Sequence, residues 1–130
     1  MKYLLIIILV GFTEVSFAQK EIKIGDARKY VGDSVKIFSK IYGGKYLEAV
    51  KGSPTFLSLG RPYPNSDLTI VIWDDARKLF KKVPEDYYKG ALVSITGRIQ
   101  MFNNNPSIIV SNPNQIQEII IDKFALSFPM

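Results

Sequence analysis

The chain has 130 residues, with 17 Lys and Arg against 12 Asp and Glu, so its net charge near neutral pH is +5. This length supports one domain with a modest core. The chain contains no Cys and no His, which excludes disulfides, zinc sites built on those residues, and Ser-His-Asp or Cys-His catalysis. No cofactor is predicted. The basic charge suits a polyanionic partner such as nucleic acid, acidic polysaccharide or a membrane surface.

Residues 1–18 are typical of a secretory signal peptide. Lys2 is followed by an apolar run over residues 4–10, and Ser16 and Ala18 are small residues at the positions that signal peptidase recognises. A membrane anchor is the alternative, but the run is short and a span needs about 20 apolar residues. We therefore predict cleavage after Ala18, no integral membrane span in the mature chain, and a periplasmic or secreted location.

Residues 34–42 alternate between apolar and polar side chains and predict the first strand. One face of this strand would be buried and contains Val35, Ile37 and Ile41. The other face contains Lys36, Phe38, Lys40 and Tyr42. Gly43 and Gly44 follow directly and allow the bend or bulge that a closing sheet needs.

Two further strands, at residues 55–60 and 68–73, form a predicted central hairpin around a turn rich in Pro and Asn. Because successive side chains of a strand point to opposite sides, the hairpin would bury Leu57, Leu59, Leu68, Ile70 and Ile72. Its other face would carry Phe56, Ser58, Thr69, Val71 and Trp73.

The period changes after the hairpin. Asp74 or Asp75 resembles a helix N-cap, and residues 76–83 predict a helix that packs one apolar side and exposes a basic one. The packed side would hold Leu79, Phe80 and Val83. The exposed side holds Arg77, Lys78, Lys81 and Lys82, which form either a solvated helix face or a footprint for a polyanion.

The last two predicted strands cover residues 91–102 and 107–111. In the longer strand the inward residues would be Val93, Ile95, Ile99 and Met101, and the outward ones Ser94, Thr96, Arg98, Gln100 and Phe102. Gly97 lies on the inward side, where a glycine marks a bulge or a close backbone approach. Ile108 and Val110 would point inward from the final strand.

Three strands, one helix and two strands within about 80 residues predict an all-β fold of the OB type, a five-stranded Greek-key barrel. We predict a single domain over residues 19–130, with a core at 30–116. The tail, 117–130, is apolar for a free end and is expected to add a strand or to pack against the barrel.

Five segments together resemble a known family: YVGDSVKIFSKI, SPTFLSLGRPYPN, LTIVIW, PEDYYKGALVSITGRI and PSIIVSNPNQI. They are similar to small bacterial OB-fold modules of the nucleic-acid-binding, tRNA-anticodon-like type, which occur in exported proteins. The resemblance covers residues 30–116 and implies the fold and nucleic-acid binding. The chain departs from the family pattern at Ser39, where a glycine is expected.

OB-folds bind ligands across the second and third strands and the loops beside them. The residues predicted to form this surface are Lys36, Phe38, Lys40, Tyr42, Phe56, Ser58, Arg61, Tyr63, Thr69, Val71, Trp73, Arg98 and Phe102. Aromatic rings stack on bases, and Lys and Arg neutralise phosphates.

Each group has a structural alternative. The rings of Phe38, Phe56 and Trp73 could instead pack under the helix or the tail. The loop with Arg61 and Tyr63 could be only a rigid turn. Two adjacent carboxylates after the hairpin suggest a metal site, but helix capping explains them as well, and no metal site is predicted.

The leading hypothesis is a non-catalytic exported module that binds single-stranded DNA, RNA or another polyanion. The alternative is a periplasmic adaptor that binds a protein or a small ligand. A calcium-dependent nuclease is a third interpretation, and the scattered positions of the acidic residues disfavour it.

Overall fold

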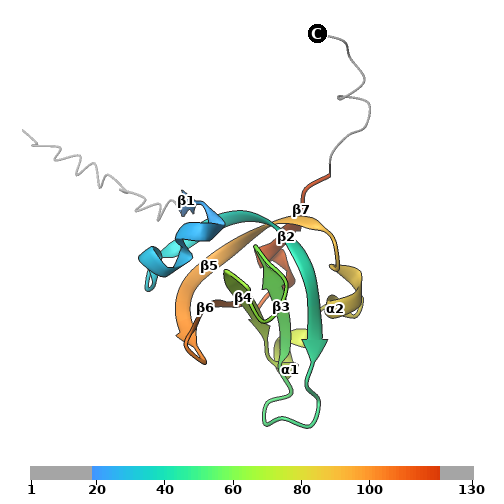
Figure 1. The fold of residues 1–130 in the computed structure, drawn as a ribbon. Helices are drawn as coiled ribbons and strands as arrows, with labels where there is room; N and C mark the ends of the chain where they lie inside the picture. The colour runs from blue at the N-terminus through green and yellow to red at the C-terminus, as the bar shows by residue number, and fades with distance from the viewer. Residues whose placement is uncertain (1–18, 121–130) are drawn as a thin grey trace, which may run out of the picture.

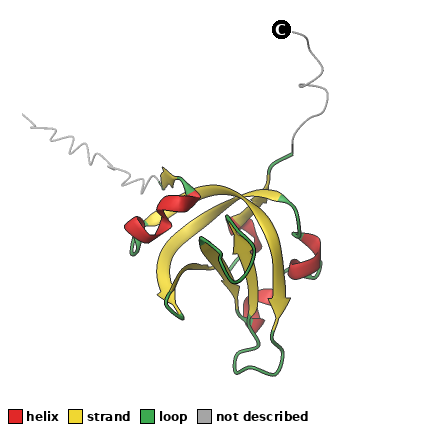
Figure 2. Ribbon diagram, in the orientation of Figure 1, coloured by secondary structure: helices red, strands yellow, loops and turns green. Residues whose placement is uncertain are grey.

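The computed structural model describes residues 19–120, so the predicted signal peptide and the tail beyond residue 120 lie outside it. The strands are β1 (Lys20–Ile22), β2 (Ser34–Tyr46), β3 (Thr55–Leu59), β4 (Leu68–Ile72), β5 (Leu92–Phe102), β6 (Asn105–Ile109) and β7 (Ile116–Glu118). The helices are η1 (Ile24–Tyr30), α1 (Asp74–Arg77), α2 (Pro84–Tyr87) and η2 (Pro113–Gln115). The described chain is thus mostly β, as predicted, and its short helices lie around the strands (Figure 2).

The predicted strand number of five is wrong, because the described residues form seven strands. The five predicted strands correspond to β2, β3, β4, β5 and β6. The additional ones, β1 and β7, have three residues each, which is too short to show an alternating pattern. The second of these is the strand that the tail was expected to add, and it pairs with β5.

Hydrogen bonding between neighbouring strands closes into a ring. The antiparallel pairs are β2–β3, β3–β4, β5–β6 and β2–β5, and the remaining pair, β4–β6, is parallel. The closure depends on β2, whose first half pairs with β5 and whose second half pairs with β3. In Figure 1, β2 and β5 are the long curved strands that arch over the three shorter ones.

The interior of this five-strand ring is the predicted core. Every predicted inward residue except Met101 is fully buried: Val35, Ile37, Ile41, Leu57, Leu59, Leu68, Ile70, Ile72, Val93, Ile95, Ile99, Ile108 and Val110. Burying each such side chain is worth about 1.5–3 kcal/mol. Met101 is 45% exposed, and the prediction for it is wrong because it pairs with Pro106 near the tip of the β5–β6 hairpin, past the end of the core.

Glycines allow the sharp bends that a ring of five strands requires. The register of β2 against β3 shifts between Ile41 and Gly43, which confirms the predicted bulge. Gly97 is a close approach, since a Cβ there would lie 2.6 Å from Cγ2 of Ile108. Ser39, where a glycine was expected, is accommodated because its hydroxyl accepts a hydrogen bond from the Gly60 amide at 3.1 Å.

The predicted helix is much shorter than its sequence pattern. It ends at Arg77, and its N-cap position is held by Trp73, not by Asp74 or Asp75. Only Phe80 of the predicted apolar side packs against the core, whereas Leu79 and Val83 are exposed. Proline disfavours helical backbone in the residue before it, so Val83 could not extend the helix, and Pro84 starts a separate turn, α2. None of the helices within residues 19–120 has the length and apolar character needed to cross a membrane.

A partly buried ion pair joins the two α-helices to the end of the ring. Arg77 donates two hydrogen bonds to the Glu85 carboxylate, at 2.7 and 3.0 Å, and another to the Thr55 hydroxyl at 2.7 Å. Its guanidinium lies 3.6 Å from the centre of the Tyr46 ring. Burial is the largest single influence and would raise the pKa of Glu85, but the hydrogen bonds from Arg77, a backbone hydrogen bond and the positive charge of Arg77 together lower it. The same bonds raise the pKa of Arg77.

Replacing Glu85 should therefore cost stability in a way that depends on pH. Because its pKa is lowered by folding, the carboxylate stabilises the protein above its unfolded pKa, and this stabilisation is lost as the pH falls through the folded pKa. Glu85→Gln should lower the free energy of unfolding by about 1.5–3 kcal/mol at neutral pH, and the deficit should shrink below about pH 4.5. Urea denaturation at several pH values measures this. The exposed Glu21→Gln is the control, and a pH-independent deficit would contradict the prediction.

Gly97→Ala should destabilise the fold by about 1–3 kcal/mol, because the added methyl group has no room beside Ile108. Gly25→Ala is the matched control, since a Cβ at Gly25 has no neighbour within 4 Å. Thermal denaturation of both variants tests the comparison. Equal melting temperatures for the two would show that β5 and β6 do not approach as closely as described.

Candidate nucleic-acid interface

Three aromatic side chains from different parts of the chain meet on the outer surface of the five-strand ring. The Phe102 ring lies 5.9 Å from that of Phe56 and 5.7 Å from that of Trp73, centre to centre. Phe56 comes from β3, Trp73 directly follows β4, and Phe102 ends β5. All three are partly exposed. We call the outward surface of β3, β4, β6 and the end of β5 the aromatic face.

The rings also cover the residues beneath them. Val71 lies directly opposite Phe56 and is fully buried, although it belongs to the outward side and not to the core cluster. Directly paired residues on neighbouring strands share a face, so side chains of the aromatic face must shield it. The rings therefore have two roles at once: they pack over Val71 and still present surface to solvent. Packing under the helix or the tail was the structural alternative drawn from the sequence; the rings of Phe56 and Phe102 instead lie on the side of the sheet that covers Val71, and binding stays a prediction.

The β2–β3 loop forms one border of the aromatic face. A Cβ at Gly52 would lie 2.9 Å from the Trp73 ring, so the loop backbone contacts that ring closely. The Gly52 carbonyl also accepts a hydrogen bond from the Asp74 amide at 3.1 Å. Only glycine allows this approach, and its φ of +82° favours glycine as well. The loop thus fixes the position of the indole.

Basic and polar side chains surround the rings. Lys45 of β2 pairs directly with Phe56 and is exposed. Alternation along β5 places Arg98, Gln100 and Phe102 on the same outward side, and Arg98 is exposed. Lys45 was not among the residues predicted to form the binding surface. Its outward position follows from the one-residue shift that the bulge after Ile41 introduces into the alternation of β2.

Four other predicted binding residues lie elsewhere. Lys36, Phe38 and Lys40 pair with β5, and Tyr42 follows at the bulge. In the order of the ring, the β2–β5 pair lies across from β4. The two Lys ammonium groups lie 5.3 and 5.1 Å from the neighbouring Phe38 and Tyr42 ring centres. These residues form a second surface, the β2–β5 face, which is separate from the aromatic face.

The β3–β4 loop has the properties of a rigid turn. Arg61 forms an ion pair with Asp67 at 2.7 Å across the loop. Gly60, with a φ of +80°, accommodates the same Asp67 side chain. Tyr63 is 84% exposed and does not join the three rings. The structure therefore brings together Phe56, Trp73 and Phe102, with Thr69 two residues from Val71 on the same face. Arg98 pairs with Ser34 of β2, and Arg61 and Tyr63 also lie outside the group of rings.

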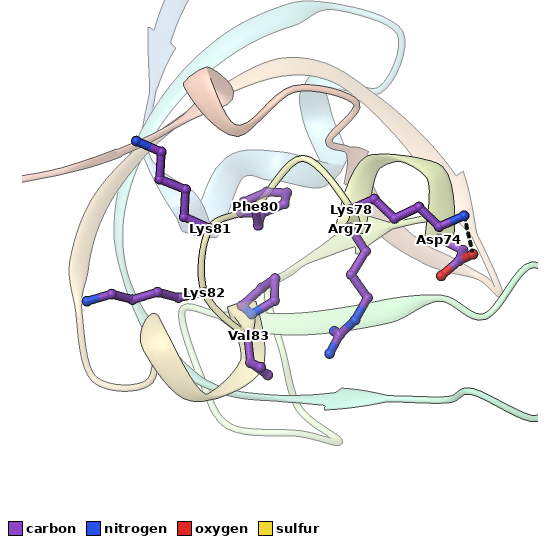
Figure 3. A pocket seen from close by; sticks show the side chains of 8 residues that line it. Asp74, Arg77, Lys78, Phe80, Lys81, Lys82 and Val83 are labelled. Carbon is purple, nitrogen blue, oxygen red and sulfur yellow. Dashed lines mark ion pairs between the residues drawn. The ribbon is translucent and has the colours of Figure 1, made fainter.

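A basic pocket of about 280 Å³ lies beside α1 (Figure 3). Its lining consists of Asp74, Arg77, Lys78, Phe80, Lys81, Lys82, Val83 and Pro84. Lys78 pairs with Asp74 at 3.4 Å, and Arg77 is held by Glu85. Lys81 and Lys82 extend away from the rest of the lining in Figure 3. Of the predicted basic side, these two lysines remain without an acidic partner among residues 19–120.

In the part of the chain that the structure describes, no three acidic side chains gather as a metal ion would require. Asp74 and Asp75 instead lie in the first turn of α1. Acidic side chains near a helix N-terminus interact favourably with its dipole. Their position is thus compatible with a local structural role.

No protein-family model matches the sequence, and a search of curated proteins finds no match. Among solved structures, the fold is similar to a protein described as an aspartyl-tRNA synthetase from Leishmania major Friedlin. The TM-score is 0.47 at 13% identity, over 84% of this chain and 22% of that one. For the aspartyl tRNA synthetase from Entamoeba histolytica the TM-score is 0.48 at 14% identity, over 79% and 23%. The chain spans less than a quarter of either protein, and likenesses this distant do not indicate its function.

Removing Phe102 should expose the indole of Trp73, the only tryptophan of the chain. We expect Phe102→Ala to shift the fluorescence emission to longer wavelength and to increase quenching by acrylamide, because water reaches the ring. Phe38→Ala, on the β2–β5 face, should leave both signals unchanged. An unchanged emission in Phe102→Ala would mean that the two rings do not touch in solution.

Proposed function

We propose that the five-strand ring is a Greek-key OB-fold barrel. The order β2-β3-β4-β6-β5, the parallel pairing of β4 with β6 and the helical segments between β4 and β5 support this assignment. An OB-fold is a five-stranded, partly open Greek-key barrel. The strands β1 and β7 then extend the barrel where β2 pairs with β5.

We further propose that the protein is a non-catalytic module that binds single-stranded nucleic acid on the aromatic face. The contact between the partly exposed rings of Phe56, Trp73 and Phe102 is the observation that supports it. The rings lie on the strands and beside the loop that hold oligonucleotides in OB-folds. Base stacking on such rings contributes about 1–3 kcal/mol per base and tolerates any sequence.

Phosphate contacts would come from the basic residues around the rings. Lys45 and Arg98 are exposed on the outward surface, and neither forms an ion pair among the described residues. Both are therefore available to neutralise phosphates, which makes affinity depend on salt. The binding would be sequence-tolerant, because every base has a face that can stack on a ring and every nucleotide carries a phosphate.

The proposal includes export, for which the pattern of residues 1–18 is the support. A second candidate function is an adaptor that docks a protein through the β2–β5 face. The observation that favours it is the exposure of Phe38 and Leu92, each 43% exposed on neighbouring strands.

Titration of residues 19–130 with labelled single-stranded oligonucleotides tests the proposed function. Phe56→Ala should weaken binding about 5- to 150-fold through the loss of one stacked base. Lys45→Ala should weaken it less and reduce the dependence of affinity on salt. Phe38→Ala is the matched control, because it removes a ring from the β2–β5 face, and its affinity should equal that of the wild type.

Heparin in place of the oligonucleotide separates stacking from charge. Oligonucleotide binding should quench Trp73 and persist at near-physiological salt, whereas heparin should bind only at low salt. Equal binding of both polymers, or the same loss in Phe38→Ala as in Phe56→Ala, would contradict the proposal and favour the adaptor. Degradation of the oligonucleotide after addition of calcium would indicate a nuclease.

A further inference from the structure

A row of small polar side chains crosses the aromatic face beside the rings. Ser58 of β3 pairs with Thr69 of β4, and Thr69 pairs with Ser107 of β6. Ser107 in turn pairs with Gln100 of β5. Since directly paired residues share a face, the four side chains form a line across four strands. We call its three hydroxyl-bearing members, Ser58, Thr69 and Ser107, the hydroxyl row.

The row lies at a defined distance from the rings. Ser58 is two residues beyond Phe56 on β3, and Thr69 is two residues from Val71, the partner of Phe56. Two residues advance about 6.8 Å along an antiparallel strand. This spacing is comparable to the distance between a base and the sugar hydroxyl of the same nucleotide. A base stacked on Phe56 can therefore place its sugar over Ser58 and Thr69.

Two of the hydroxyl groups are free to meet a ligand. Among residues 19–120, no buried side-chain oxygen lacks a hydrogen-bond partner. The Ser58 and Thr69 hydroxyls form no bond with another described side chain or backbone group, so they must reach solvent, although Ser58 is only 8% exposed. Ser107 differs, because it is 1% exposed and donates to the Asn105 carbonyl at 3.2 Å. In the row, the Ser107 hydroxyl is thus buried and hydrogen-bonded, whereas the Ser58 and Thr69 hydroxyls, which lie next to the aromatic rings, can bind a ligand.

We infer that the aromatic face prefers RNA to single-stranded DNA, because Ser58 and Thr69 bind the 2′-hydroxyl groups of stacked nucleotides. This inference rests on the proposed function. A 2′-hydroxyl both donates and accepts hydrogen bonds, as Ser and Thr hydroxyls do, and it is the group by which proteins distinguish RNA from DNA. Stacking on the rings and phosphate contacts to Lys45 are common to both nucleic acids, so they add affinity without preference.

The test compares an adenine-only RNA oligonucleotide with the DNA oligonucleotide of the same sequence and length. One or two hydrogen bonds of about 0.5–1.5 kcal/mol each correspond to RNA binding roughly 2- to 150-fold tighter. The double variant Ser58→Ala with Thr69→Val keeps similar side-chain volumes. The ratio of its RNA affinity to its DNA affinity should fall to about one, whatever the change in its affinity for DNA.

A serine on the other face supplies the control. Ser94 pairs with Phe38 on the β2–β5 face, so Ser94→Ala should keep the full preference for RNA. Equal affinity of the wild type for RNA and DNA would overturn the inference and leave the proposed function intact. A preference that survives in the double variant would overturn the assignment to the hydroxyl row. Failure to bind either oligonucleotide would overturn both proposals. An unchanged Trp73 emission spectrum confirms that the double variant is folded.

Discussion

The architecture depends on one strand pairing with two different partners. The first half of β2 pairs with β5 and its second half pairs with β3. This double pairing is possible only because the backbone of β2 bends after Ile41. The bend turns an open sheet into a ring whose interior excludes water from the inward-facing aliphatic side chains of the core. Gly97 provides the matching tight approach on β5. Without closure of the ring, the sheet would lack the curvature that separates the aromatic face from the β2–β5 face.

Closure also explains why the predicted binding residues fall into two groups. In a flat sheet, outward side chains of β2, β3, β4 and β5 would share one surface, which is what alternation alone suggests. In a ring, the outward directions of β2 with β5 and of β3 with β4 diverge. Lys36, Phe38, Lys40 and Tyr42 are therefore separated from the rings of the aromatic face, and only one of the two surfaces lies beside the β2–β3 loop.

Much of the fold could be predicted from sequence because it depends on local rules. Alternation identified five of the seven strands and nearly all of the core, and Gly43 and Gly97 marked the bend and the close approach. The helix was overestimated, because the periodic pattern of residues 76–83 continues beyond Arg77, where the helix ends. The separation of the two faces, the approach of Gly52 to Trp73 and the Arg77–Glu85 pair depend on contacts between distant segments. No pattern within a single segment of the sequence predicts such contacts.

The two short strands at the margins have a consequence for behaviour at high concentration. Among residues 19–120, β1 and β7 are the outer strands of the order β1-β2-β5-β7, so within this part of the chain each has backbone groups that could pair with another molecule. Each is three residues long and contains an exposed glutamate, Glu21 in one and Glu118 in the other. Short, charged edges are poor templates for strand addition. The sheet is thus protected from edge-to-edge aggregation by the brevity of its margins.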